Sequence, residues 1–428
     1  MRHVELKVTS RSQGDHTIMS VLGEIDLYTA PTLQSQLTSA LAPGQVKLIV
    51  DMSGVDFCDS TGINVLLAAH RQAIERGGEL QLASPGSATR KVLQVTGLES
   101  VFTVVDEPSE PSRDRFGEVL AMARAADASG LSALWVAEHH FHTGGGCPAP
   151  PVLLAAAAAT THRLRVGALV SVLPFHDPVD VAEQYAMVDR VSGGRLNMGV
   201  GSGYIASELE GFHVDPATKQ ERFDRALETI RAAWAGRPVR PAHEAGAEVV
   251  LNVRPVQQPH PPLWIAVQRR AAIPHVARKS VSVALVPYAT TGGLEELAEE
   301  VREFRAAVPA GAASEVAVAL HLYAGDGPET ARASLQRYLD RRLATQSRFY
   351  QEKVRADPRH ASARTIEESG FALFGKPVDV ASRLEEFRRI GVDEVVGIFD
   401  FGGLPHEAVL ASIRALGETM KSSAPAPY

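Results

Sequence analysis

The chain has 428 residues, of which 45% are hydrophobic and 22% charged, and its net charge is −7. This composition is typical of a globular protein with two or three domains and excludes a disordered or fibrous chain. The weak negative charge argues against nucleic acid as the main partner. No apolar run reaches the roughly 20 residues that a membrane span needs, and the N-terminus lacks a signal-peptide core. We therefore expect a cytoplasmic protein whose partners are proteins and small molecules.

The cysteines predict neither a disulfide framework nor a zinc site. There are only two, Cys58 and Cys147, far apart and without a CxxC motif. Cys147 follows the glycines 144–146, where we expect a buried, inert thiol; the alternative is a reactive thiol near a pocket mouth. No metal site is predicted.

The first 107 residues alternate short apolar runs with amphipathic segments. Strands are expected at Val4–Val8, Ile18–Ile25, Val46–Val50, Leu80–Ala83 and Phe102–Val105. Helices are expected after Pro31, with an apolar face of Leu33, Leu37 and Leu41, and at Ala88–Val95. A third helix would be capped by Asp59 or Ser60 and bury Ile63, Leu66, Leu67 and Ile74 before Gly77-Gly78 ends it.

Two motifs in this region carry a family resemblance. GEID at Gly23–Asp26 and DSTG at Asp59–Gly62, in this order of strands and helices, resemble the STAS domain of bacterial anti-sigma-factor antagonists. The resemblance implies that Ser60 is phosphorylated by a partner kinase, with Thr61 as the alternative acceptor. A helix N-terminus tolerates a phosphate dianion, while the new charge would alter any docking surface. The other interpretation is that Asp59 and Ser60 only cap the helix.

Beyond the linker at residues 108–112, strands and helices alternate, which is the βαβ pattern of a parallel sheet. Seven strands are expected: Leu134–Ala137, Leu164–Val172, Leu196–Gly199, Leu263–Val267, Val281–Val286, Val316–Leu322 and Val392–Ile398. Helices are expected at Val152–Thr160, Pro178–Arg190, Ala217–Ala235, Leu294–Ala307, Glu329–Thr345, Val378–Ile390 and His406–Met420. An eight-stranded barrel would then lack one strand, the first.

Several segments resemble the bacterial luciferase-like flavin-dependent monooxygenases, whose fold is a (β/α)8 TIM-type barrel. They are WVAEHHF at Trp135–Phe141, the long run Leu164–Tyr204, GFHVDP at Gly211–Pro216, PPLWIA at Pro261–Ala266 and FGKPVDVASRLEEF at Phe374–Phe387. The ending at Gly391–Gly402 resembles a branch found alongside natural-product assembly enzymes. We therefore expect an α/β protein with a STAS domain at 1–107, a linker at 108–112, a barrel at 113–422 and a disordered tail at 423–428.

The resemblance implies a catalytic histidine at His139, with Glu138 beside it. The apolar run before them is typical of a buried strand that ends at a polar rim, where barrels keep their active sites. Histidine exchanges a proton near neutral pH. If the strand stays regular, His139 and His140 point to opposite faces and cannot both face the pocket. The other interpretation of the pair is a hydrogen-bonded structural one.

The resemblance also implies a reduced flavin and a dry pocket in which it reacts with oxygen. Gly201, Ser202, Gly203 and Tyr204 form a glycine-rich turn where backbone amides could approach the flavin. Leu173 would line the ring pocket. Where the family offers hydroxyls to the flavin phosphate, this chain has Arg269 and Arg270, which would bind phosphate or be surface arginines. We expect Glu208 and Glu210 to lie on a solvated face.

The first barrel strand has no segment of its own. Either Phe102–Asp106 joins the barrel and frays the STAS sheet, or the barrel has an open seam that exposes unpaired backbone.

The leading hypothesis is a monooxygenase that uses reduced FMN and O2 on an organic substrate, with the STAS domain regulating it or docking it to an anti-sigma kinase. A variant keeps the barrel but transfers hydride with a deazaflavin. The alternative is a partner-switching binding protein with a degenerate barrel. The family resemblance also implies a possible homodimer.

Overall fold

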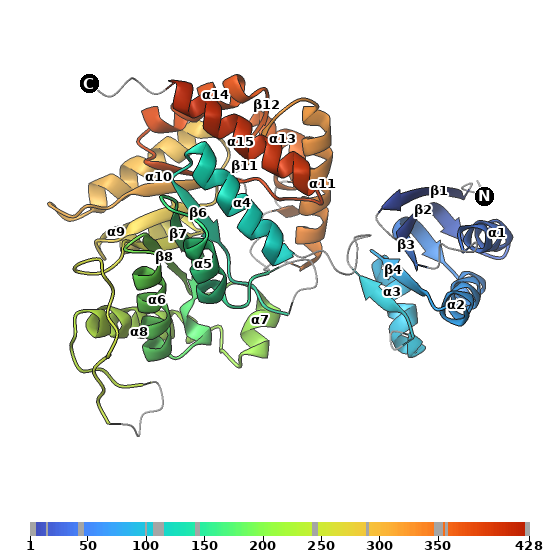
Figure 1. Ribbon diagram of the computed structural model, residues 1–428, viewed down its shortest axis with the longest axis horizontal. Coiled ribbons are helices and arrows are strands. Elements are labelled where there is room, and N and C mark those ends of the chain that lie inside the picture. Colours follow the sequence, from blue (N-terminus) through green and yellow to red (C-terminus); the bar gives the residue numbers. More distant parts are fainter. Residues whose placement is uncertain are drawn as a thin grey trace. The chain divides into compact units, whose positions relative to one another are not determined.

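The computed structural model describes residues 6–13, 16–41, 47–98, 101–105, 115–141, 146–241, 247–287, 291–345, 354–355 and 358–423 (Figure 1). They form two compact units, the second of which starts at Arg115. The predicted linker at 108–112 lies outside the described residues, as does residue 424 onward of the predicted tail. None of the described helices is long and apolar enough to cross a membrane.

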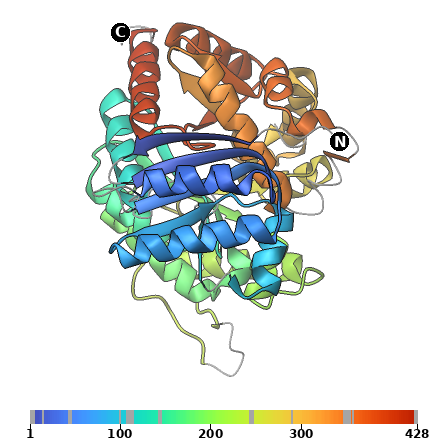
Figure 2. The same ribbon diagram turned by 90° about the vertical axis from the view of Figure 1, so that its right-hand side faces the viewer.

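The N-terminal unit is a five-stranded sheet with three helices. Its strands, in spatial as well as chain order, are β1 (Lys7–Gln13), β2 (His16–Ile25), β3 (Lys47–Cys58), β4 (Glu79–Ala83) and β5 (Thr103–Val105). Only β1 runs antiparallel to its neighbour. Helices α1 (Ala30–Ala40) and α2 (Ser60–Glu75) lie side by side (Figure 2), and α3 (Ser87–Val95) precedes β5. The sheet buries its own apolar core.

The predictions for this unit need three corrections. The first strand starts at Lys7 and runs to Gln13, later than predicted, because it pairs as a hairpin with β2 along its whole length. The strand β3 continues past Val50 to Cys58 because its end follows β2 as far as the Ile25–Cys58 pair. Ile74 is 54% exposed, so it does not belong to the buried stripe of α2, whereas Ile63 and Leu66 do.

The second unit contains a parallel sheet surrounded by helices. Its strands are β6 (Ala133–Val136), β7 (Arg165–Val172), β8 (Leu196–Gly201), β9 (Leu263–Val267), β10 (Ser282–Leu285), β11 (Val316–Ala324), β12 (Ala372–Gly375) and β13 (Glu394–Ile398). Strands β6 to β11 are neighbours in chain order, and β11 pairs with β13 and, through its last four residues, with β12. The seven predicted strands are all present; β12 was not predicted. In β7, a non-prolyl cis peptide joins Leu169 to Val170, where the register with β8 shifts.

The helices of this unit lie outside the sheet (Figure 1). They are α4 (Arg115–Ser129), α5 (Pro150–Ala159), α6 (Pro178–Val191), α7 (Ala206–Gly211), α8 (Lys219–Trp234), α9 (Ile273–Ala277), α10 (Leu294–Ala307), α11 (Pro328–Thr345), α13 (Ala363–Glu368), α14 (Pro377–Arg389) and α15 (His406–Ser423). The helix α15 ends three residues later than predicted and includes Ser423, the first residue of the predicted tail.

The barrel sheet is open between β6 and β13. Strand β5 stays in the sheet of the N-terminal unit, where Thr103 pairs with Gln81 of β4, so no described strand fills the first position of the barrel. The helical layer closes instead, because α4 packs on α15. A Cβ on Gly417 would lie 2.6 Å from the Cβ of Ser129, so this close approach requires glycine. Of the two alternatives, the described residues therefore favour the open seam.

Aromatic side chains fill part of the lumen beside this seam. The indole Nε1 of Trp135 donates a 2.7 Å hydrogen bond to Oε1 of Glu394, linking β6 to β13. Trp135 also meets Trp264 edge to face, at 5.7 Å between ring centroids. A Cβ on Gly167 would lie 2.6 Å from the Trp135 ring, so only glycine leaves room for it. Burial raises the pKa of the Glu394 carboxyl more than the Trp135 hydrogen bond lowers it.

Candidate functional site

The predicted site residues lie just beyond the carboxyl end of β6. That strand ends at Val136, so Glu138, His139 and His140 belong to the following loop. The loop is tied down by two backbone bonds, from Glu138 N–H to the Val170 carbonyl (3.1 Å) and from His139 N–H to the Cys147 carbonyl (3.3 Å). Strand alternation therefore does not govern the two histidines, and each has a carboxylate partner of its own.

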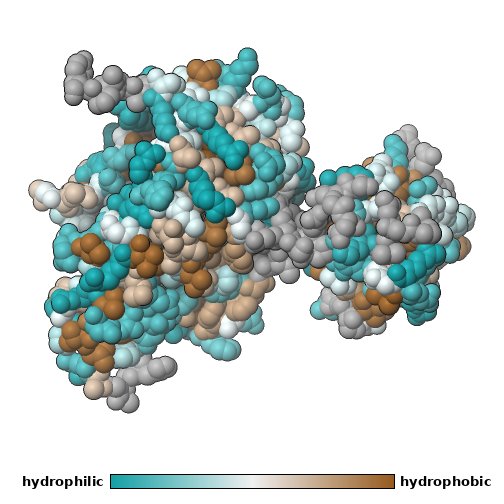
Figure 3. Space-filling model, viewed as in Figure 1, coloured by the Kyte–Doolittle hydropathy of each residue, from teal (hydrophilic) through white to brown (hydrophobic). Residues whose placement is uncertain are grey.

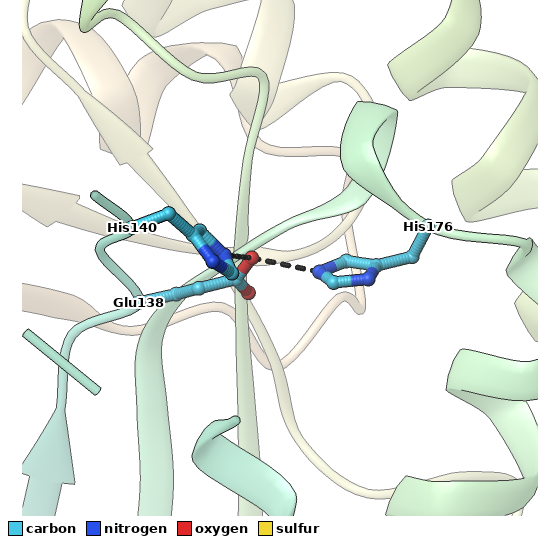
Figure 4. Close-up of side chains that lie close together, drawn as sticks. All are labelled: Glu138, His140 and His176. Atoms are coloured by element: carbon cyan, nitrogen blue, oxygen red, sulfur yellow. Dashed lines mark hydrogen bonds and ion pairs between the residues drawn. The ribbon is translucent and has the colours of Figure 1, made fainter. Parts of the chain in front are cut away.

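Glu138 is the centre of a buried hydrogen-bond network. Its carboxylate is 2% exposed. Its Oε1 accepts from Nε2 of His140 at 2.9 Å and from Nε2 of His176 at 2.7 Å. Its Oε2 accepts from the Ser171 hydroxyl and the Val172 N–H, both at 2.9 Å. Figure 4 shows the two imidazoles converging on the carboxylate from different elements. Burial would raise the pKa of Glu138, but the hydrogen bonds from His176, His140 and Val172 outweigh it and lower the pKa.

The same three side chains have the ligand types of a metal site. One ligand atom from each of Glu138, His140 and His176 lies within 4.8 Å of the other two. A His2Glu set is used by catalytic zinc. The four donors already satisfy both oxygens of Glu138, so a metal would have to displace two imidazole protons. The arrangement is therefore complete as a hydrogen-bond network.

Aromatic rings hold His140 in place. Its imidazole lies 4.6 Å from the Phe212 ring, edge to face, and 5.9 Å from that of Phe175, while Phe175 and Phe212 stack on each other. His140 is 9% exposed, whereas the side chains of His139 and His176 are each 28% exposed. Of the adjacent pair, His139 is thus the one that a bound molecule could reach.

His139 has its carboxylate partner on α7. Its Nδ1 lies 3.1 Å from Oε1 of Glu208, and the same oxygen accepts the N–H of His140 at 2.9 Å. The prediction that Glu208 lies on a solvated face is wrong, because this side chain is 2% exposed. Glu210, two residues on, is exposed as predicted. A six-residue helix can turn one of two nearby carboxylates inward and leave the other in water.

The glycine-rich turn follows β8 beside His139. The Tyr204 ring meets the His139 ring edge to face at 6.3 Å between centroids. Gly201 is buried at the end of β8, and Ser202 and Gly203 are half-buried. Leu173, predicted to line the ring pocket, is 1% exposed and packs in the barrel core. Cys147 is buried, and burial raises the pKa of its thiol.

Basic side chains gather at the ends of β8 and β9. Lys219, at the start of α8, donates from Nζ to the Gly203 carbonyl. Burial lowers the pKa of Lys219, and the charge of nearby Arg269 lowers it further. A shallow hollow that is open to solvent lies against Arg269, Arg270 and the buried Glu300. Arg270 is partly engaged, since it pairs with Glu299 at 3.1 Å and Glu303 at 3.0 Å on α10.

The sequence assigned no functional role to His176, Glu208 or Lys219. His176 stands inside the family-like run Leu164–Tyr204, but the resemblance assigns it no role. Glu208 and Lys219 carry no motif of their own, and only their contacts across the barrel mouth identify them.

Comparison with known proteins identifies both units. Residues 99–394 match the model of the luciferase-like monooxygenase family, and residues 7–110 match that of the STAS domain. The chain belongs to the luciferase-like monooxygenase family and carries a STAS domain at its N-terminus. Both matches include residues 99–110, and in the structure β5 of this segment pairs with the STAS sheet.

Three curated relatives illustrate the range of similarity. The uncharacterized protein y4wF of Sinorhizobium fredii is 35% identical over 199 residues, which are 46% of this chain and 58% of that protein. The oxygenase component of the flavin-dependent trigonelline monooxygenase of Acinetobacter baylyi is 24% identical over 349 residues, 75% of this chain and 94% of that one. The anti-sigma-F factor antagonist RsfB of Mycobacterium tuberculosis is 31% identical over 97 residues, 23% of this chain and 79% of RsfB.

Solved structures share the barrel. Monooxygenase RslO1 of Streptomyces bottropensis superposes with a TM-score of 0.63 and 26% identity, covering 74% of this chain and 95% of that one. The oxygenating constituent of 3,6-diketocamphane monooxygenase of Pseudomonas putida, in complex with FMN, gives 0.60 and 16%, covering 75% and 96%. The coenzyme F420 dependent tetrahydromethanopterin reductase of Methanopyrus kandleri gives 0.54 and 16%, covering 72% and 96%. At 16% identity the last two show the fold alone.

Proposed function

We propose that the barrel is a flavin-dependent monooxygenase that uses reduced FMN and O2 on an organic substrate. The observation that carries this proposal is the partly exposed imidazole of His139, held by the buried carboxylate of Glu208 at the carboxyl end of the barrel strands. This is where barrel enzymes place their chemistry. The FMN in the 3,6-diketocamphane monooxygenase and the flavin dependence of the trigonelline monooxygenase support the cofactor.

The residues present fit a flavin phosphate. Lys219 and Arg269 lie close enough for each charge to oppose the other, and a bound anion would relieve that repulsion. In this proposal Lys219 and Arg269 hold the phosphate, with Arg270 in a lesser role because it already pairs with two glutamates.

The turn from Gly201 to Tyr204 would hold the ring system. A Cβ on Gly203 would lie 3.1 Å from Val172, and the Gly203 φ of +78° favours glycine. The turn therefore has no side chain at this position. Ser202 remains a candidate for contact with the flavin, whereas Leu173, which is 1% exposed, would support the pocket wall from behind. Bound reduced flavin would supply the electrons that activate oxygen. His139 would hold or move a proton, Glu138 would keep the adjoining loop in place through its four hydrogen bonds, and Tyr204 would shield His139 from water.

A titration with matched ligands tests the cofactor. Reduced FMN should bind, and Lys219→Ala and Arg269→Ala should each weaken it by roughly tenfold, about the loss of one charge-assisted hydrogen bond. Binding of riboflavin, which has no phosphate, should not change in either variant, and Arg270→Ala should have a smaller effect on FMN. His139→Ala should bind FMN normally but fail to oxygenate substrate. Failure of the wild-type protein to bind FMN would refute the proposal.

A deazaflavin is the second candidate cofactor, because the fold is shared with a reductase that depends on coenzyme F420. The same titration with F420 decides between the two. Tight binding of F420 with no binding of FMN would make the reaction a hydride transfer in place of an oxygenation.

We also propose that the STAS unit is a docking module controlled by phosphorylation of Ser60. Asp59 caps α2 by accepting from the N–H groups of Thr61 (2.7 Å) and Gly62 (3.0 Å), so the cap does not need the Ser60 hydroxyl. Ser60 is exposed. Large apolar side chains are exposed near it at the ends of β2 and β3, namely Leu22, Leu27, Tyr28 and Phe57, at 50–75%.

The partner that would cover this apolar surface is an anti-sigma kinase, because the similar protein RsfB is an anti-sigma-F factor antagonist. Phosphate on Ser60 would add charge beside Asp59 and weaken apolar docking. Ser60→Asp should reduce binding of such a kinase, while Ser60→Ala should bind it but resist phosphorylation, as phosphopeptide mass spectrometry would show. Phosphorylation at Thr61 in Ser60→Ala would move the site by one residue. If the kinase binds and no flavin does, the protein is a partner-switching protein with an inactive barrel.

We also propose that the barrel forms a homodimer through its early helices. Figure 3 shows apolar side chains along α5, where Val152 is 72% exposed, and Met187 and Val191 on the adjoining α6 are about half exposed. In light scattering, the wild type should have the mass of a dimer and Val152→Lys that of a monomer. A wild type with the mass of a monomer would refute the proposed homodimer.

A further inference from the structure

Two carboxylates that lie far apart in the sequence meet the two adjacent histidines. Glu138 pairs with His140, and Glu208, 69 residues beyond His139, pairs with that ring through Nδ1. Glu208 also fixes the loop itself, because its Oε1 accepts the His140 N–H at 2.9 Å. Oε1 of Glu208 thus holds both the backbone at His140 and the imidazole of His139.

We infer that Glu208 is a positioning residue that holds His139 in the tautomer with the proton on Nδ1. An ionised carboxylate only accepts hydrogen bonds, so the 3.1 Å contact requires a proton on Nδ1. In the neutral ring, Nε2 is then the basic nitrogen. The buried partner of an imidazole fixes its tautomer and orientation in this way in acid–base sites. This inference rests on the proposed function of His139 and adds the group that makes its Nε2 the nitrogen that exchanges the proton.

The burial of Glu208 strengthens the inference. A buried carboxylate without partners is costly, so a side chain that is 2% exposed is retained where its hydrogen bonds offset the loss of hydration. Gly146 packs at the same place: a Cβ there would lie 2.9 Å from the Cβ of His139. The Gly146 backbone therefore confines the Cβ of His139, while the Tyr204 ring and the Glu208 carboxylate contact its imidazole.

Three variants separate this role from a general effect on folding. Glu208→Gln keeps an oxygen that can accept from Nδ1 and from the His140 N–H but has no charge. Glu208→Leu removes the acceptor. Glu210→Leu changes an exposed carboxylate of the same helix and is the matched control. The full-length protein is used throughout.

The decisive measurement is NMR of ¹⁵N-labelled histidine, with His139→Gln used to assign the His139 signals. In the wild type, in Glu208→Gln and in Glu210→Leu, we expect the neutral His139 ring to carry its proton on Nδ1 and none on Nε2. Glu208→Leu should lose this fixed tautomer. A wild-type ring with the proton on Nε2, or an unchanged tautomer in a folded Glu208→Leu, would overturn the inference. If Glu208→Leu does not fold, the wild-type tautomer still decides.

A second measurement follows the reoxidation by O2 of reduced FMN bound to the protein. If Glu208 acts through His139, then Glu208→Leu and His139→Gln should change this rate by the same factor, roughly 100-fold for an acid–base group. The double variant should change it no further. Factors that multiply would show independent roles and overturn the inference. Absence of FMN binding by the wild type would instead refute the proposed function, and the tautomer measurement would still decide the role of Glu208.

Discussion

Replacing Glu138 with glutamine tests the buried network at the barrel mouth. The carboxylate accepts four hydrogen bonds, two at each oxygen. The Val172 N–H cannot reverse its direction, so the amide oxygen of glutamine has to take the Oε2 position. The amide NH2 then faces the two imidazoles, which have to change tautomer to accept from it or lose their hydrogen bonds.

The magnitude follows from the change of charge. A hydrogen bond to an ionised group contributes about 1.5–3 kcal/mol and one between neutral groups about 1 kcal/mol. Weakening the four hydrogen bonds of Glu138 in this way lowers the unfolding free energy by about 4 kcal/mol. Burying a neutral amide costs less than burying a carboxylate, which offsets roughly 1–2 kcal/mol of this loss. We therefore expect Glu138→Gln to reduce the unfolding free energy of the barrel by about 2–3 kcal/mol at pH 7.

Tryptophan fluorescence in urea measures the barrel by itself. The chain has three tryptophans, Trp135, Trp234 and Trp264, and all of them lie in the second unit. Their signal therefore reports the unfolding of the barrel whether or not the STAS unit unfolds with it. Glu210→Gln, a change at an exposed carboxylate, is the control and should stay within about 0.5 kcal/mol of the wild type.

The direction of the Glu138 pKa shift predicts how the stability difference between the wild type and Glu138→Gln changes with pH. The pKa of Glu138 is lowered in the folded protein, so its stabilising contribution is present above the ordinary glutamate pKa of about 4.3 and is lost as the pH falls below it toward the folded value. The advantage of the wild type over Glu138→Gln should shrink over that range. Equal stability at pH 7, or a difference that is the same at pH 7 and pH 3, would refute the reasoning.

Three further predictions concern the seam, the cap and the metal. Trp135→Phe removes the donor to the half-buried carboxylate of Glu394 and should lower barrel stability by about 1–3 kcal/mol in the urea assay; an unchanged midpoint would contradict this. Asp59→Ala should destabilise α2 by about 1 kcal/mol, seen as faster amide exchange at Gly62, whereas Ser60→Ala should not. Dialysis against EDTA should leave the urea midpoint unchanged because protein donors satisfy Glu138. A lower midpoint after EDTA that Zn²⁺ raises again would instead assign a metal to Glu138, His140 and His176.

The sequence predicted the fold well because the strands of a parallel sheet are short apolar runs that reveal themselves locally. All seven predicted barrel strands are present, and Leu263–Val267 and the helix Leu294–Ala307 have the predicted bounds. Strand β12 was not predicted, and its pairing with the end of β11 is a tertiary contact that the sequence does not reveal. The strand at Phe102–Val105 was predicted, but the sequence left open which sheet it joins.

For the site, the sequence by itself determined the family-like motif around His139 and the place of that motif at the end of a buried strand. Only the tertiary structure decided what each side chain there contacts. Glu208 is buried and Glu210 exposed although both belong to one short helix, and His176 reaches Glu138 from the loop after another strand. The physical reason is that periodicity reports which face of a segment is buried, whereas a hydrogen bond between residues 69 positions apart depends on how the strands and loops converge.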